Sequence, residues 1–224
     1  MSTESAQPRK SRRLLTVVAL VLSLSITLGS IFFVIYRLRM PSTTSSGAAI
    51  VDSSSYFDGV TPIDPPRKVA DFTLTGTDGQ PLSLSDLYGK VTLLYFGYTH
   101  CPDVCPLTLG DFKRVKDKLG DNASKVNFLM VSVDGARDTP EQMKRFLSGF
   151  DPSFVGMTGN TDQLQAIAPD YDLYFHANVE EGENYTVDHT ASIFVIDPEG
   201  NLRMSFTFGT DPDVIVGHLK DLLS

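Results

Sequence analysis

The stretch Tyr95-Phe-Gly-Tyr-Thr-His-Cys-Pro-Asp-Val-Cys-Pro106 contains the only two cysteines of the 224-residue chain, Cys101 and Cys105. It continues an apolar, β-prone run that begins at Val91, and a segment with helical periodicity follows it. A loop that carries thiols between a buried strand and a helix N-terminus favours thiol chemistry. The spacing of the two cysteines permits thiol redox, a shared metal ion or a structural disulfide.

Strand and helix signals alternate on both sides of this stretch. Strands are expected at 71–75, 91–97, 126–133, 153–157, 191–196 and 202–208, and helices at 107–119, 139–150, 161–171 and 211–223. This order predicts an α/β fold, with a mainly parallel sheet to which a closing hairpin adds antiparallel strands. It fits a thioredoxin-like core with an N-terminal β extension and a β-hairpin insertion at 174–187. The cysteine loop is expected at the C-terminal ends of the strands.

An uncharged run of 23 residues, 14–36, precedes the expected domain. As a helix it would be about 35 Å long, enough to cross a hydrocarbon core of ~30 Å, so we expect one uncleaved transmembrane helix. Four basic residues precede the run and two closely follow it, which predicts a cytoplasmic N-terminus and an extracytoplasmic domain. The 13 residues before the run favour a bacterial plasma membrane over a mitochondrial one.

Four parts are expected along the chain: a cytoplasmic N-terminus (1–13), the anchor (14–36), a flexible Pro- and Ser-rich linker (37–64) and a thioredoxin-like domain (65–224). The first 40 residues hold six of the 19 Lys and Arg and one of the 27 Asp and Glu, so the remainder has a net charge of −13. This charge argues against nucleic-acid binding. Solubility accounts for it, and a basic or metal-carrying partner would also suit it.

His189 is the candidate third ligand beside the two thiols. It precedes the expected strand at 191–196, in a loop that faces the cysteine loop in thioredoxin-like folds. Disulfide oxidoreductases usually have a cis-proline there, but this chain has no proline between Pro169 and Pro198. Two thiolates and one imidazole form a donor set that suits copper. The other histidines are expected in non-ligand positions: His100, His176 and His218.

Three motifs together resemble the Sco/SenC family of copper chaperones. They are the cysteine stretch, Val131-Ser-Val-Asp134 with Arg137-Asp-Thr-Pro140, and Asp188-His-Thr-Ala-Ser-Ile-Phe-Val-Ile-Asp-Pro-Glu-Gly200. The likeness covers about residues 65–224, and the expected membrane anchor matches too. The resemblance implies a thioredoxin fold. It also implies delivery of copper to the CuA site of cytochrome c oxidase subunit II, or reduction of the cysteines of that site, with this subunit or its assembly factors as partners.

The resemblance implies a copper site, for Cu(I) or Cu(II), made by Cys101, Cys105 and His189. Asp138 matches an acidic position that the family places near the metal loop, so it is a candidate to support the ligands from outside the coordination sphere. A role as a cap or turn residue before Thr139 is equally open for it.

Two other functions are open to these residues. A thiol–disulfide oxidoreductase outside the cytoplasm would use Cys101 and Cys105 as a redox-active pair and need no metal. A peroxidase of the same fold is disfavoured, because Thr99 lies two residues before Cys101 and such a site needs three. Whether the protein is an enzyme is therefore left open by the sequence.

Overall fold

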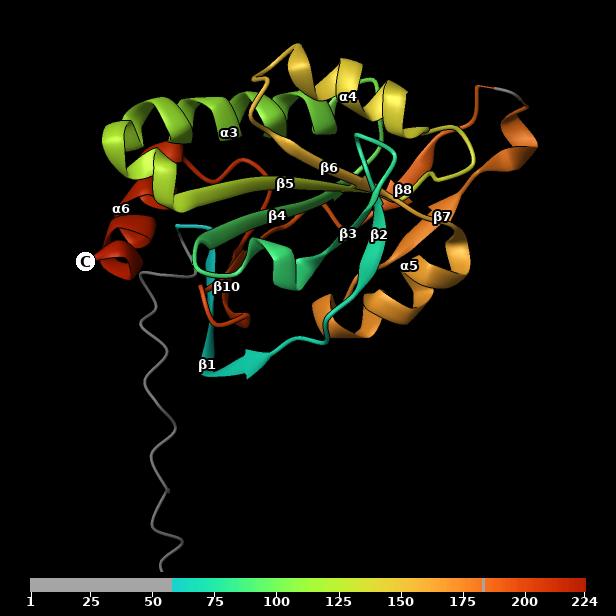
Figure 1. The fold of residues 1–224 in the computed structure, drawn as a ribbon. Helices are drawn as coiled ribbons and strands as arrows, with labels where there is room; N and C mark the ends of the chain where they lie inside the picture. Colours follow the sequence, from blue (N-terminus) through green and yellow to red (C-terminus); the bar gives the residue numbers. More distant parts are fainter. Residues whose placement is uncertain (1–57, 183) are drawn as a thin grey trace, which may run out of the picture. The chain divides into compact units, whose positions relative to one another are not determined.

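The computed structural model describes residues 58–182 and 184–224 (Figure 1). The predicted N-terminal segment, the predicted anchor at 14–36 and the linker up to residue 57 lie outside the described residues. Within the described ranges, no helix is both long and apolar enough to cross a membrane.

An eight-stranded mixed sheet forms the centre of the described domain, in the order β1-β10-β9-β4-β5-β6-β2-β3. Its strands are β1 Val60–Lys68, β2 Thr73–Gly76, β3 Pro81–Ser83, β4 Val91–Gly97, β5 Val126–Ser132, β6 Val155–Thr158, β9 Ile193–Ile196 and β10 Asn201–Phe206. β4 and β6 run parallel to β5, and the other neighbouring strands pair antiparallel. The prediction of a mainly parallel sheet is therefore wrong.

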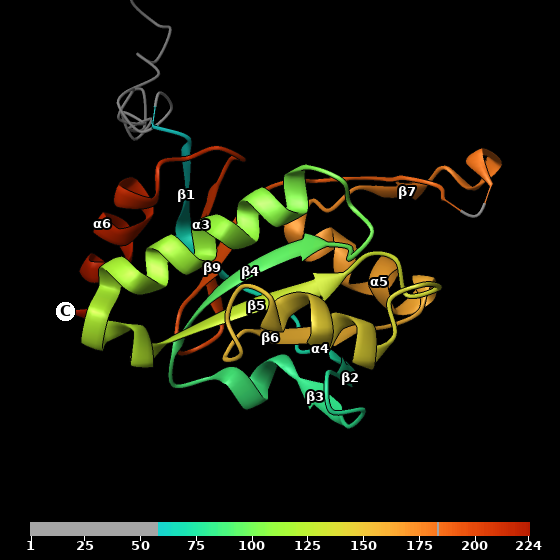
Figure 2. The same ribbon diagram turned by 90° about the horizontal axis from the view of Figure 1, so that it is seen from above.

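The direction of β9 explains part of this difference. A parallel neighbour of β4 would need a crossover that returns to the start of that strand. The chain instead enters β9 from a hairpin, formed by β7 Phe175–Ala177 and β8 Val187–His189. Only residues 190–192 separate this hairpin from β9, so β9 starts at the end of the sheet where β4 finishes. The hairpin insertion itself is confirmed, and Figure 2 shows it extending away from the main sheet.

β1 begins inside the segment that was predicted to be linker. Val60 is buried and pairs with Phe206 of β10. The register of this pairing shifts between Pro62 and Arg67. Prolines are tolerated on an edge strand, because its outer amides need no partner in the sheet. Residues 60–64 thus belong to the folded domain, and the predicted boundary at residue 65 is too late.

Four α-helices accompany the sheet within the described residues: α3 Val104–Leu119, α4 Pro140–Ser148, α5 Thr161–Ile167 and α6 Pro212–Leu223. Short 3-10 turns are η1 Leu84–Leu87, η2 Gly120–Lys125, η3 Ala168–Tyr171 and η4 Val179–Glu181. α3 and α4 cover one face of the sheet and α5 lies on the other, while α6 packs against α3 (Figures 1 and 2). The predicted capping box at the start of α4 is confirmed: Thr139 and Gln142 bond each other's backbone amides.

β4 is the strand that positions the thiols. All seven of its residues are buried, as its continuous apolar run predicts for a strand covered on both faces. It is paired with β5 on one side and β9 on the other. A strand held this firmly gives the loop that follows it a fixed starting point.

Candidate metal centre

Three side chains from different parts of the chain meet at the end of β4. Cys101 lies in the loop after this strand, Cys105 in the first turn of α3, and His189 at the end of β8. Their ligand atoms all lie within 4.8 Å of one another, and His189 Nε2 is 3.6 Å from Cys105 Sγ. The structure thus brings together the three residues that the sequence singled out as ligands.

The antiparallel pairing of β9 with β4 causes this meeting. Ile193, the first residue of β9, lies opposite Tyr95 near the end of β4. Residues just before β9 are therefore close to residues just after β4. The imidazole of His189 comes to the thiols although 84 residues separate it from Cys105.

Asp138 holds the loop that leads to Cys101. Its fully buried carboxylate accepts hydrogen bonds from the Thr99 amide at 2.9 Å and the Thr99 hydroxyl at 2.5 Å. Ser132 Oγ donates a third bond at 2.6 Å. The α4 cap is instead the Thr139 side chain. The carboxylate of Asp138 therefore supports the cysteine loop and does not cap the helix.

The two thiols differ in their electrostatic environment. The hydrogen bond from the Cys105 side chain lowers the pKa of Cys101 well below its ordinary value, and the backbone amides of Cys105 and Asp103 lower it further against the effect of burial. The amide of Cys105 lies 3.4 Å from Cys101 Sγ, as expected for an anion at a helix N-terminus. The same thiol pair raises the pKa of Cys105, and burial adds to this. This environment thus favours the thiolate form at Cys101 and the protonated thiol at Cys105.

The imidazole of His189 is held in one tautomer. Its Nδ1 lies 3.0 Å from the carbonyl oxygen of Thr190. Because a carbonyl only accepts, Nδ1 must carry the proton, and the lone pair is then on Nε2, which faces the thiols. Tyr95 and Tyr98 pack edge-on around the ring, with centroid distances of 5.9 Å and 5.8 Å. A hydrogen bond from Nδ1 to a backbone carbonyl, with Nε2 left free, is the usual arrangement for a histidine that ligates a metal.

Sequence reasoning missed Tyr95 as a part of this site. Its side chain is fully buried, and its hydroxyl donates a hydrogen bond of 3.4 Å to Cys105 Sγ. A signal was present, because a phenol inside an otherwise apolar buried strand needs a polar partner. The sequence does not say which residue that partner is.

A second group of possible ligands consists of His100, Asp134 and Asp138. Protein donors already occupy both carboxylates: Arg137 lies 2.6 Å from Asp134, and Thr99 donates two hydrogen bonds to Asp138. His100 Nδ1 is 3.4 Å from Asp138 Oδ1, so this histidine pairs with a buried acid. We assign no metal to this group.

The other two histidines are not in the group of ligand atoms at the thiols. His176 is exposed in β7, opposite Asp188 of β8. His218 lies in α6, with its ring 5.9 Å from that of Phe206.

An open groove runs beside the thiols and gives access to them. Cys101 and His189 line it together with Asp103 and Asp188, which give its rim two acidic groups. Cys105 does not line the groove and is fully buried. A molecule that enters the groove therefore reaches Cys101 before Cys105.

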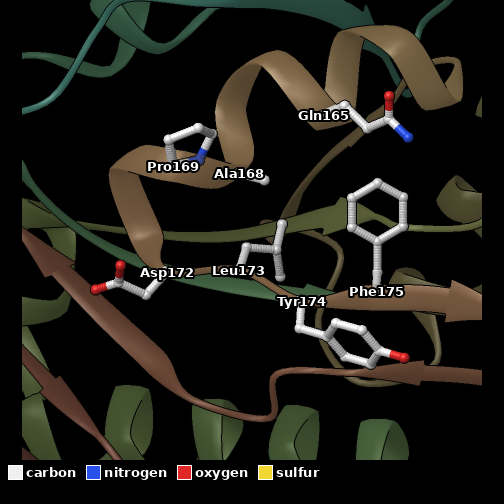
Figure 3. Close-up of a pocket in the computed structure, with 7 residues that line it drawn as sticks. All are labelled: Gln165, Ala168, Pro169, Asp172, Leu173, Tyr174 and Phe175. Atoms are coloured by element: carbon white, nitrogen blue, oxygen red, sulfur yellow. The ribbon is translucent and has the colours of Figure 1, made fainter.

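A separate hollow lies between the end of α5 and the start of the hairpin. Figure 3 shows Pro169 and Ala168 on one side of it and Tyr174 and Phe175 on the other. Its lining contains one carboxylate, Asp172, and neither sulfur nor imidazole. This hollow therefore lacks the thiol and imidazole groups that meet at the end of β4.

The part of this chain that matches a known protein family begins at the same residue as its folded domain. The model of the SCO1/SenC family matches residues 60–224, so the match starts where β1 starts. A putative copper-binding protein of Stutzerimonas stutzeri is 31% identical over 175 residues, which cover 78% of this chain and 84% of that protein. The structure of Bradyrhizobium japonicum ScoI with copper bound has a TM-score of 0.64 and 37% identity, covering 69% of this chain and 99% of that one.

Mitochondrial relatives are longer. Protein SCO2 of Saccharomyces cerevisiae is 40% identical over 132 residues, which cover 58% of this chain and 44% of that protein. The chain thus spans about half the length of the mitochondrial relatives that it matches.

Proposed function

This chain belongs to the SCO1/SenC family, and we propose that it is a copper chaperone of cytochrome c oxidase assembly. In this proposal it delivers copper to the CuA site of subunit II, or reduces the cysteines of that site. The observation that carries the proposal is the convergence of Cys101, Cys105 and His189, whose ligand atoms lie within 4.8 Å of one another. The copper-bound ScoI structure and the copper-binding relative support the choice of metal.

The donor set fits copper on chemical grounds. Two thiolates suit Cu(I), and the addition of one imidazole also suits Cu(II). His189 offers a lone pair at Nε2, because its Nδ1 proton bonds the Thr190 carbonyl. The lowered pKa of Cys101 favours its thiolate form before metal binds, whereas Cys105, with its raised pKa, must release a proton on binding. Loading is therefore expected to be favoured as the pH rises.

Transfer of the metal requires that a ligand of the partner can enter the site. Three protein ligands leave room for a fourth, and Cys101 and His189 both line the open groove. Cys105 lies buried behind them. We propose that a cysteine of the partner attacks from the groove and replaces Cys101 first, so that copper passes by stepwise ligand exchange.

The proposal places the site outside the cytoplasm. Residues 14–36 form the proposed transmembrane anchor, with residues 1–13 in the cytoplasm because the flanking basic residues are more numerous before the run than after it. Residues 37–59 form the proposed tether, and the domain from residue 60 faces away from the cytoplasm of a bacterial cell. An oxidising compartment would convert an unprotected thiol pair to a disulfide, so the site must be reduced before it can bind copper.

A thiol–disulfide oxidoreductase is the second candidate. One observation favours it: Cys101 lies in a groove with a lowered pKa, and Cys105 stands beside it as a resolving thiol. This function needs no histidine ligand. It also predicts that the protein acts on disulfides of its partner when no copper is present.

Copper binding by His189→Ala, with His176→Ala as the matched control, tests the chaperone proposal. Both histidines lie on the hairpin, but His176 is exposed and is not in the group of ligand atoms that Cys101, Cys105 and His189 form. The reduced full-length protein should bind one copper ion per chain, and His189→Ala should lose more than about 100-fold in affinity, since even residues behind the ligands cost 10–100-fold. His176→Ala should bind as the wild type does.

The outcomes separate the two candidates. If His189→Ala binds copper at full strength, the ligand assignment is wrong. If the reduced wild type takes up no copper but still reduces a disulfide in the soluble domain of subunit II, the oxidoreductase is the better description. Copper transfer from the loaded protein to that domain, lost in His189→Ala, supports the chaperone.

A further inference from the structure

Tyr95 touches two of the three proposed ligands from inside the sheet. Its hydroxyl donates a hydrogen bond of 3.4 Å to Cys105 Sγ, and its ring meets the ring of His189 edge-on at 72°. The side chain has no solvent exposure, so no water competes for the hydroxyl from bulk solvent. A hydrogen bond in such surroundings is stronger than on a surface.

Gly97 leaves the space in which this contact forms. A Cβ atom at this position would lie 2.5 Å from the Tyr95 ring and 3.1 Å from Cys105 Sγ. Any side chain here would push the phenol and the sulfur away from their present positions. The absence of a side chain at Gly97 therefore leaves room for the Tyr95 side chain beside the Cys105 sulfur.

A hydrogen bond to a ligating sulfur changes the metal that it holds. The donated proton draws electron density from the sulfur and weakens its donation to a metal. Cu(II) depends more on that donation than Cu(I) does, so the bond shifts preference toward Cu(I). We propose that Tyr95 is a positioning residue that holds Cys105 Sγ by this hydrogen bond and makes the site favour Cu(I) over Cu(II). The inference rests on the proposed function, because it assumes that copper binds here.

Tyr95→Phe tests this role, because it removes the hydroxyl and keeps the ring. Tyr171→Phe is the matched control: Tyr171 is 2% exposed, packs on Phe96 and Phe194, and its hydroxyl has no hydrogen-bond partner among the described residues. Both changes delete one buried hydroxyl, but only Tyr95→Phe removes a hydrogen bond to the Cys105 sulfur.

The first measurement uses the reduced full-length protein with copper. The ratio of the Kd for Cu(II) to the Kd for Cu(I) should fall about tenfold in Tyr95→Phe, which corresponds to a one-electron potential lower by about 59 mV. The thiolate-to-Cu(II) absorption band should move to longer wavelength. Tyr171→Phe should leave both unchanged. An unchanged ratio in Tyr95→Phe overturns the proposal.

The second measurement uses the copper-free protein. Glutathione disulfide oxidises the two thiols to a protein disulfide and releases two molecules of glutathione, and the equilibrium constant of this exchange is measured. Because the hydroxyl stabilises the reduced Cys105 sulfur, Tyr95→Phe should raise the constant roughly three- to tenfold, and Tyr171→Phe should not. If the wild type binds no copper, the proposed function and the copper preference both fail. The exchange then decides alone whether Tyr95 holds Cys105, and equal constants for the two variants overturn that role.

Discussion

Tyr185 donates a 2.7 Å hydrogen bond from its hydroxyl to Oδ1 of Asp134, which joins the hairpin to the loop after β5. The guanidinium of Arg137 lies 3.5 Å from the centre of the Tyr185 ring and forms an ion pair with Asp134 at 2.6 Å. The same hairpin ends in His189. We therefore expect the position of this imidazole to depend on a polar cluster, formed by Tyr185, Asp134 and Arg137, that contains none of the proposed ligands.

The loop after β5 also holds the cysteine side of the site. Asp138 lies in it and binds Thr99, two residues before Cys101. Residues 133–139 thus connect to both the thiol loop and the histidine hairpin. A disturbance in this loop is expected to separate the proposed ligands without touching any of them.

Tyr185→Phe should loosen the hairpin that carries His189. Among the described residues, the lost hydroxyl leaves the Asp134 carboxylate with Arg137 as its hydrogen-bonded partner, and the expected cost is about 1 kcal/mol, the usual worth of one hydrogen bond. We expect broader NMR signals from the His189 ring in the copper-free protein and a several-fold faster release of copper from the loaded one. Tyr174→Phe is the control, because Tyr174 starts the same hairpin and is 60% exposed. If the two variants behave alike, the polar cluster does not position the histidine.

Asp138→Ala should destabilise the fold and the cysteine loop together. It leaves the amide and hydroxyl of Thr99 and the hydroxyl of Ser132 without their buried acceptor, so we expect a loss of about 2–4 kcal/mol in the free energy of unfolding. Urea denaturation measures this loss. Asp117→Ala, at an exposed carboxylate paired with Lys113, should cost less than about 0.5 kcal/mol. Equal losses in the two variants would show that the buried carboxylate of Asp138 stabilises the fold no more than an exposed one does.

The buried strand and the cysteine loop could be predicted from the sequence, because both depend on local patterns. The apolar run of β4 and the capping box at Thr139 appear where their residues predict them, and the expected hairpin forms with its second strand at Val187–His189, later than the predicted 185–187. Local patterns do not specify strand direction. Whether β9 runs with or against β4 depends on how the chain returns to the sheet, and this is decided by contacts between distant residues.

Two other features depend on long-range partners. β1 could not be separated from the linker, because its prolines suggest a loop until the free edge of β10 is known. The role of Tyr95 could not be predicted, because its partner Cys105 lies in a helix that packs over the strand. His189 could be named as a candidate ligand from the sequence, because a histidine stands where disulfide catalysts of this fold usually have a proline.

The two thiols should differ in their reaction with an alkylating reagent. The lowered pKa of Cys101 keeps it ionised, so its rate with iodoacetamide should change little between pH 8 and about 5, where an ordinary thiol with a pKa of about 8.5 slows about tenfold per pH unit. Cys105, with a raised pKa and no exposure, should react only after unfolding. Mass spectrometry of the copper-free protein resolves the two sites.

Cys105→Ala is the informative variant for this prediction. It removes the hydrogen bond that contributes most to the low pKa of Cys101. The alkylation rate of Cys101 should then fall with pH more nearly as an ordinary thiol does. A rate that stays flat in this variant would mean that the backbone amides at the helix N-terminus alone stabilise the Cys101 thiolate.

Asp151 should make the stability of the domain depend on pH below 4. Burial raises the pKa of this carboxyl, but the hydrogen bonds from Lys116 at 2.6 Å and from Ser153 outweigh it and bring the pKa to about 2, from an ordinary value of 3.8. The unfolded chain therefore takes up the proton first as the pH falls. The stabilisation, about 2 kcal/mol, is fully present above pH 4 and is lost as the pH falls toward 2.

Urea denaturation of Asp151→Asn between pH 5 and 2 measures this contribution. The variant should be less stable than the wild type at pH 5 by up to about 2 kcal/mol, and the difference should shrink toward pH 2 because the wild type has then lost the same charge. Asp117→Asn serves as the control, since Asp117 pairs with Lys113 in an exposed position and should change the pH profile little. A constant difference between Asp151→Asn and the wild type across this range would mean that the carboxyl contributes through its shape and not through its ionisation.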